Sequence, residues 1–199
     1  MKTASLRDFV EVKGRFHRSV QLNRDWEGRG DFGDYPLTPT ARELATRMAS
    51  VLEEPGGPRA WSVTGPYGSG KSAFALFLAD LLAHDPPRHA RGEELRRDLG
   101  LTDPPLVPVL VVGQRAHIKP ALLGSLAEAI EPLDGALAGE ISAAARGGTI
   151  DDEGVVALFE RAAAAAGEAG RGGLLVVLDE FGKFLEHVCP CTPRPMTYS

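Results

Sequence analysis

A chain of 199 residues, 43% of them apolar and 25% charged, is long enough for one globular domain with a sizeable core. Its net charge of −5 gives no overall indication of nucleic-acid binding, and no apolar run approaches the roughly 18 residues of a membrane helix. Residues 1–12 contain no apolar region typical of a signal peptide, so we expect a cytoplasmic protein without membrane contact.

The N-terminal third of the chain combines an extension and a helix. Residues 1–37 show little hydrophobic periodicity and are expected to form an N-terminal extension. A helix is predicted to follow, because Pro39 suits a first helical turn, and Thr40 with Glu43 has the spacing of a capping box. The sequence PGGP at 55–58 ends this helix.

Three short apolar segments are predicted to be strands, at 60–64, 106–112 and 174–178. Pro108 moves the expected start of the second strand to about Val109. The third segment is apolar throughout, which is typical of a strand buried on both faces of a parallel sheet. The predicted helices between and around the strands cover 72–84, 93–99, 119–130, 133–145 and a segment from Asp151 or Asp152 to 166. This alternation predicts a layered α/β fold.

Residues Gly65–Ser72 (GPYGSGKS) fit the phosphate-loop pattern G-x-x-x-x-G-K-[ST] without a mismatch. Glycines let backbone N–H groups approach phosphate oxygens, and the helix that follows offers unpaired N–H groups and its positive dipole end. Lys71 is expected to contact the β- and γ-phosphates, and the Ser72 hydroxyl to bind Mg²⁺. The alternative interpretation is a glycine-rich turn before a helix. The predicted nucleotide-binding residues are Gly65, Pro66, Tyr67, Gly68, Ser69, Gly70, Lys71 and Ser72.

Two carboxylates, Asp179 and Glu180, directly follow the third predicted strand. Ligands gather at the carboxyl ends of parallel strands, so Asp179 is predicted to hold Mg²⁺ directly or through water. Glu180 is predicted to orient and deprotonate an attacking water, which with Lys71 completes the expected catalytic pair. The alternative is a strand that ends in a solvated acidic turn. Lys183 is expected to be an ordinary surface lysine.

The sequence GPYGSGKS followed by LLVVLDE resembles the Walker A and Walker B motifs of P-loop ATPases of the additional-strand, catalytic-glutamate group, which includes AAA+ and STAND-type ATPases. The resemblance covers residues 38–187 and extends to the N-terminal ATPase part of large bacterial ATP-binding proteins. It implies a three-layer fold with a mostly parallel sheet, and ATP and Mg²⁺ as ligands. It also implies ATP hydrolysis that drives a partner or an adjacent module, within a homo-oligomer or a multidomain assembly.

Two alternatives to an ATPase stay open. One is a non-catalytic nucleotide-binding fragment or signalling module that uses ATP only as a ligand. The other is a phosphotransferase, which the pair Asp179–Glu180 disfavours because it suits water activation better.

The C-terminal part departs from the pattern of this ATPase group. There the strand order resembles 5-1-4-3-2, so that a further strand lies between the P-loop strand and the Walker B strand. Residues 182–199 show no apolar strand pattern, and the tail at 188–199 shifts to proline, cysteine and threonine. We therefore expect a truncated or frame-shifted piece of a longer ATPase, with a sheet that is incomplete at the C-terminus and inefficient turnover. Strands 60–64 and 174–178 must then pair directly, leave a gap or recruit another chain.

Overall fold

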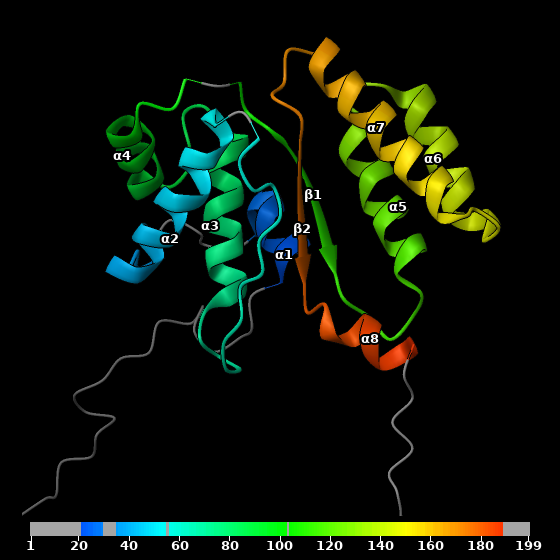
Figure 1. Ribbon diagram of the computed structural model, residues 1–199, viewed down its shortest axis with the longest axis horizontal. Coiled ribbons are helices and arrows are strands. Elements are labelled where there is room, and N and C mark those ends of the chain that lie inside the picture. The colour runs from blue at the N-terminus through cyan, green and yellow to red at the C-terminus, as the bar shows by residue number, and fades with distance from the viewer. Residues whose placement is uncertain (1–20, 30–34, 55, 103, 189–199) are drawn as a thin grey trace, which may run out of the picture.

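The computed structural model describes residues 21–29, 35–54, 56–102 and 104–188, which form a mostly helical α/β arrangement around a small parallel sheet (Figure 1). The two strands are β1 (Val107–Val112) and β2 (Leu174–Asp179). The helices before β1 are α1 (Leu22–Arg24), the π-helical turn η3 (Asp25–Arg29), α2 (Pro39–Ser50), the 3₁₀ turn η4 (Val51–Glu53), α3 (Lys71–Ala83) and α4 (Ala90–Leu99). Those after β1 are α5 (Ile118–Ile130), α6 (Gly135–Gly147), α7 (Asp152–Glu168) and α8 (Gly182–Val188).

Strands β1 and β2 pair in parallel, from Val107 opposite Leu174 to Val112 opposite Asp179. Helices α5, α6 and α7 connect them and lie on one face of the sheet, whereas α1 to α4 lie on the other (Figure 1). Side chains of β1 alternate between the two faces. Val109 packs into the cluster with α5 to α7, and Leu110 packs against α1 and α3. The predicted layered α/β architecture is thus confirmed at this coarse level.

The start of β1 differs from the prediction. The strand begins at Val107 and includes Pro108, although Pro108 was expected to delay it to about Val109. The N–H groups of Val107 and Gly113 donate to the carbonyls of Gly173 and Asp179 in the ladder, so the odd-numbered residues of β1 face β2. Pro108 points its nitrogen at the opposite edge, where the missing N–H breaks no bond to β2.

The predicted strand at 60–64 is wrong, because residues 58–66 have no strand pairing. The sheet in the described part of the chain has two strands, and the side chains of Trp61 and Val63 are 36% and 40% exposed. A strand is stable only beside a partner, and this segment makes no ladder bond to β2. Segments 60–64 and 174–178 therefore do not pair directly, which was one of the three expected outcomes.

The N-terminal cap of α2 also differs from the prediction. The Thr38 hydroxyl accepts a hydrogen bond from the N–H of Ala41 at 3.2 Å, so Thr38 caps the helix and the capping box expected at Thr40 is wrong. Pro39 occupies the first helical position, as predicted.

The two chain ends were expected to be an extension and an irregular tail. Part of the N-terminal extension packs onto the main body, because Leu22 of α1 is fully buried against α3 and β1. The expected tail at 188–199 lies outside the described residues, apart from Val188 at the end of α8.

Candidate functional site

The predicted phosphate loop runs directly into α3, whose first residue is Lys71. Gly68 and Gly70 have φ values of +79° and +87°, a left-handed conformation that glycine adopts without a steric penalty. The loop is exposed, and no side chain caps the N-terminus of α3. The N–H groups of the first helical turn and the positive end of the helix dipole are therefore available to an anion.

The side chain of Lys71 folds back along this loop. Its Nζ donates hydrogen bonds to the carbonyl oxygens of Gly65 and Pro66, at 3.0 and 2.9 Å. These two bonds keep the ammonium group beside the loop backbone rather than extended into solvent. Ser72 follows in the first turn of α3 and is partly exposed. The loop thus brings a cation and a hydroxyl to the N-terminus of one helix.

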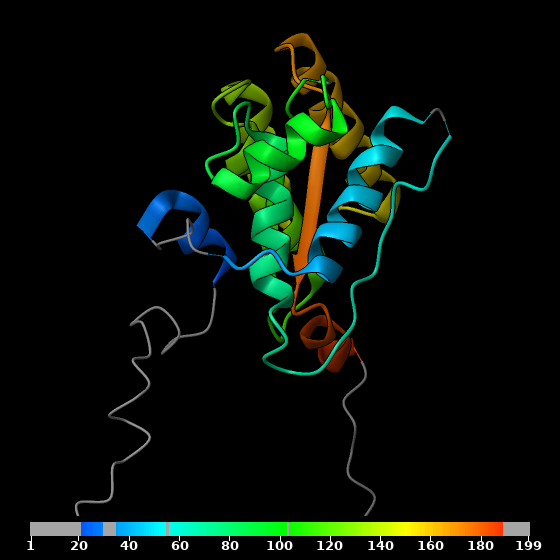
Figure 2. The same cartoon turned by 90° about the vertical axis from the view of Figure 1, so that its left-hand side faces the viewer.

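The carboxyl ends of β1 and β2 lie at the same end of the molecule as the N-terminus of α3 (Figures 1 and 2). Asp179 is the last residue of β2, and its Oδ1 accepts a hydrogen bond from the N–H of Glu180 at 2.9 Å. Glu180 has a φ of +52° and is the one non-glycine residue with positive φ in the described ranges. A glutamate in this conformation is uncommon, and such backbone strain persists only where surrounding contacts enforce it.

Gly113 lies directly against the backbone of Asp179 and Glu180. Its N–H donates to the carbonyl of Asp179 at 2.8 Å, which joins the ends of the two strands. A Cβ added at Gly113 would lie 2.1 Å from the carbonyl oxygen of Glu180, far inside van der Waals contact. The close approach of the two backbones therefore requires glycine at this position.

Lys183 contacts Glu180, the predicted general base. The sequence analysis did not predict this contact. Its ammonium forms an ion pair with the carboxylate of Glu180, and its N–H donates to the carbonyl of Glu180 at 2.9 Å. Both side chains are exposed to a similar degree, at 46% and 42%. Lys183 is thus on the surface, as expected, yet it also neutralises Glu180. The signal in the sequence is the i, i+3 spacing at the start of α8.

Ser72 and Asp179 are the two predicted Mg²⁺ ligands. Among the described residues, no group of three or more His, Cys, Asp or Glu side chains could hold a metal ion. Mg²⁺ bound to a nucleotide takes few protein ligands and completes its octahedron with phosphate oxygens and water. Ser72 and Asp179, which lie at the same end of the molecule, fit that limited role (Figures 1 and 2).

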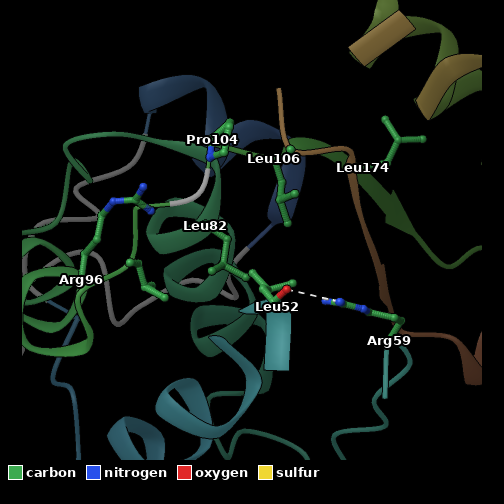
Figure 3. A pocket seen from close by; sticks show the side chains of 9 residues that line it. Leu52, Arg59, Leu82, Arg96, Pro104, Leu106 and Leu174 are labelled. Carbon is green, nitrogen blue, oxygen red and sulfur yellow. Dashed lines mark hydrogen bonds between the residues drawn. The ribbon is translucent and has the colours of Figure 1, made fainter. Parts of the chain in front are cut away.

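A pocket of about 380 Å³ lies at the opposite end, near the start of the strands (Figure 3). Leucines from η4, from α3 and from the starts of the two strands line much of it, including Leu82 and Leu106. The guanidinium of Arg59 reaches across one side and donates to the carbonyls of Leu52 and Glu54, at 3.2 and 3.1 Å. This pocket and the phosphate loop are therefore separate places in the molecule, and the pocket contains no predicted site residue.

A buried carboxylate in α3 was not predicted from the sequence. Asp80 is fully buried and accepts hydrogen bonds from Nε of Arg88 and the N–H of His89, both at 2.9 Å, and its Oδ1 lies 3.0 Å from Nδ1 of His84. Burial acts to raise the pKa of Asp80, but the hydrogen bonds from His84, Arg88 and His89 outweigh it, so the pKa is below its usual value. The network joins the end of α3 to α4 and has a structural role.

Comparisons with known proteins add no relative. No protein-family model matches the sequence, and no curated protein or solved structure shows significant similarity to it. No helix in the described ranges is long and apolar enough to cross a membrane.

Proposed function

We propose that this chain binds ATP with Mg²⁺ through Gly65–Ser72. We propose further that Mg²⁺-dependent ATP hydrolysis is its ancestral activity, with the nucleotide state driving a partner or an adjacent module. One observation carries the proposal. A glycine loop with left-handed backbone enters the uncapped N-terminus of α3 at the end of the sheet where Asp179 and Glu180 lie (Figure 1). The resemblance to Walker A and Walker B motifs points to the same chemistry.

Binding follows from the loop and α3. The triphosphate would accept hydrogen bonds from the N–H groups at the N-terminus of α3 and gain from the helix dipole. Lys71 would exchange its hydrogen bonds to the carbonyls of Gly65 and Pro66 for hydrogen bonds to the phosphate oxygens. The phosphate oxygens are stronger acceptors because they carry negative charge. Ser72 and Asp179 would hold Mg²⁺, which supplies further charge neutralisation at the phosphates when it is bound.

Hydrolysis makes a further demand on Glu180. Its carboxylate would accept a proton from the attacking water, and for this it must turn away from Lys183 toward the nucleotide. The described sheet offers Asp179 and Glu180 from a single strand and no neighbouring strand on the other side of β2. We therefore expect binding to be the strong property and turnover to be slow.

The ion pair between Lys183 and Glu180 favours a second candidate function, a nucleotide-binding module without catalysis. In this case Glu180 remains paired with Lys183, and ATP serves only as a ligand that changes the conformation of the chain or of a partner.

Lys71→Ala tests the binding part of the proposal. We expect the affinity for a fluorescent ATP analogue with Mg²⁺ to fall by about 10- to 100-fold, because a hydrogen bond to a charged group contributes about 1.5–3 kcal/mol. Lys119→Ala is the matched control, since Lys119 also lies in the first turn of a helix, α5, where its ammonium pairs with Asp152. Equal affinities in wild type and Lys71→Ala would refute the phosphate-loop assignment.

Glu180→Gln separates the two candidate functions. Phosphate release that is present in wild type and absent in Glu180→Gln, with unchanged binding of the analogue, supports an ATPase. Binding without phosphate release in either protein supports the non-catalytic module. Loss of binding in Glu180→Gln would contradict the role that we assign to Glu180.

A further inference from the structure

The backbone of Glu180 is held on two sides. Its φ is +52°, and its carbonyl oxygen lies so close to Gly113 that no Cβ fits there. The N–H of Lys183 donates to the same carbonyl at 2.9 Å, which fixes the first turn of α8 beside it. The carboxylate of Glu180 therefore changes its position mainly through its own side-chain torsions.

Helix α8, which carries Lys183, is anchored independently of Glu180. Phe184 is 2% exposed and packs into the core cluster with α5 to α7. The carboxylate of Glu186 pairs with Nε of Arg115, in the loop after β1, at 2.9 Å. These two contacts hold α8 against the carboxyl ends of the strands. The backbone of Lys183 thus keeps a constant place beside Glu180.

The ammonium of Lys183 pairs with Glu180 and, among the described residues, with no second carboxylate. Lys71 of the phosphate loop does not compete for Glu180, because its ammonium is bonded to the carbonyls of Gly65 and Pro66. Both partners of the pair are partly exposed, so solvent weakens their attraction. An ion pair of this exposure shifts the equilibrium between a paired and a free carboxylate by about two- to fivefold.

We propose that Lys183 is a positioning residue that holds Glu180 away from the attacking water, so that the ion pair restrains turnover. This inference rests on the proposed ATPase function. In that reaction the water oxygen bonds to the γ-phosphorus while its proton passes to Glu180, and the bond from the γ-phosphorus to the ADP oxygen breaks. The proton then leaves Glu180 for solvent.

Only the free carboxylate takes part in this step, because the paired one accepts from the ammonium instead. Slow turnover then has a cause in the side chains of this chain, in addition to the two-stranded sheet. Nucleotide affinity does not depend on the ion pair, because the phosphate loop and α3 make the proposed binding contacts. Lys183 thus affects the rate at saturating nucleotide and leaves binding unchanged.

Lys183→Ala in the full chain tests this role. Phosphate release at saturating ATP and Mg²⁺ is expected to rise about two- to fivefold over wild type, with unchanged affinity for the fluorescent ATP analogue. Lys183→Arg keeps the cation and should release phosphate at the wild-type rate. Arg91→Ala is the matched control, because Arg91 pairs with Glu94 at the same i, i+3 spacing on α4, at the other end of α3 (Figure 1). This control should leave the rate unchanged, and circular dichroism checks that all variants are folded.

Salt provides a readout that a purely structural role of Lys183 would not move. Raising the ionic strength from about 0.1 M to about 1 M shortens the Debye length from about 10 Å to about 3 Å. The pair in wild type is weakened, whereas Lys183→Ala has no pair to lose. The ratio of the two rates should therefore fall toward one, and saturating nucleotide removes the effect of salt on binding.

The outcomes separate this inference from the proposed function. If both proteins bind the analogue and wild type releases phosphate, a Lys183→Ala rate at or below that of wild type overturns the inference alone. A Lys183→Arg variant as fast as Lys183→Ala also overturns it, because the charge is then not the restraint. Binding without phosphate release in either protein overturns it and favours the non-catalytic module. Absence of binding in both refutes the proposed function, and the inference with it.

Discussion

Gly113→Ala is expected to destabilise the fold through a contact at the candidate site. The added Cβ would lie 2.1 Å from the carbonyl oxygen of Glu180, and its next neighbour there would be the carbonyl carbon, at 2.7 Å. Both are backbone atoms, so no flexible side chain can yield, and the ends of β1 and β2 must separate by about 1 Å to restore normal contact. The bond from the N–H of Gly113 to Asp179 holds them together at 2.8 Å.

The size of the effect follows from three terms. Overpacking of a rigid site costs about 1–3 kcal/mol, and loss or stretching of the hydrogen bond adds about 0.5–1.5 kcal/mol. Alanine also lowers the conformational entropy of the unfolded chain, which offsets about 0.4–1 kcal/mol of this destabilisation. We therefore expect Gly113→Ala to lower the free energy of unfolding by about 0.5–4 kcal/mol, with a central value of about 2 kcal/mol. For a chain of this size the central value corresponds to a fall in Tm of about 4–8 °C.

Thermal and urea unfolding followed by circular dichroism measure this change. The matched control is Gly124→Ala in α5, where an added Cβ meets no atom within 4 Å. Alanine is the better helix former, so the control should be as stable as wild type or more stable by up to about 1 kcal/mol. If Gly113→Ala unfolded at the same temperature as wild type, the close approach of the strand ends would be disproved.

Two further substitutions test the interior and a helix end. Asp80→Asn should destabilise the protein by about 2 kcal/mol at pH 7, because it removes the buried carboxylate that pairs with Arg88. The partial exposure of Arg88 limits the loss, because solvent screens its charge. The pKa of Asp80 is lowered in the folded state. Its contribution to the free energy of unfolding is therefore complete above the unfolded pKa of about 3.9 and is lost as the pH falls from there through the lower folded pKa. In urea unfolding, the difference in stability between wild type and Asp80→Asn should narrow from pH 7 to pH 3, and a constant difference would contradict this reasoning. Thr38→Ala should cost about 1 kcal/mol and lower Tm by about 2–4 °C, whereas Thr40→Ala should have little effect in the same thermal assay. A larger effect at Thr40 would restore the capping box.

Local signals in the sequence predicted most of the helices and both observed strands. Pro39 at the first helical position and the unbroken apolar run that ends at Asp179 act through neighbouring backbone, so one segment is enough to recognise them. The loop from Gly65 to Ser72 could be found in the same way, because its glycines and its helix are adjacent in the chain.

Features that depend on distant segments could not be predicted. The segment around Val63 has the composition of a strand but no partner, and composition alone does not reveal whether a neighbour exists. The need for glycine at 113 arises from Glu180, which is far away in the sequence. Asp80 looks like one polar residue in an apolar helix, and only its contacts with Arg88 and His89 explain its complete burial.

The long connection between β1 and β2 has a consequence for how the protein folds. All of α5, α6 and α7 lies between the two strands, so their pairing joins segments that are distant in the chain. Contacts of this kind form slowly, because the entropy of closing a long loop must be overcome before the strands gain their hydrogen bonds. The helices can form locally and pack against one another first, and their sheet-facing apolar side remains open until β2 arrives. During synthesis, the apolar sides of the newly made β1 and α5 to α7 are therefore exposed to aggregation and to chaperones until β2 is made.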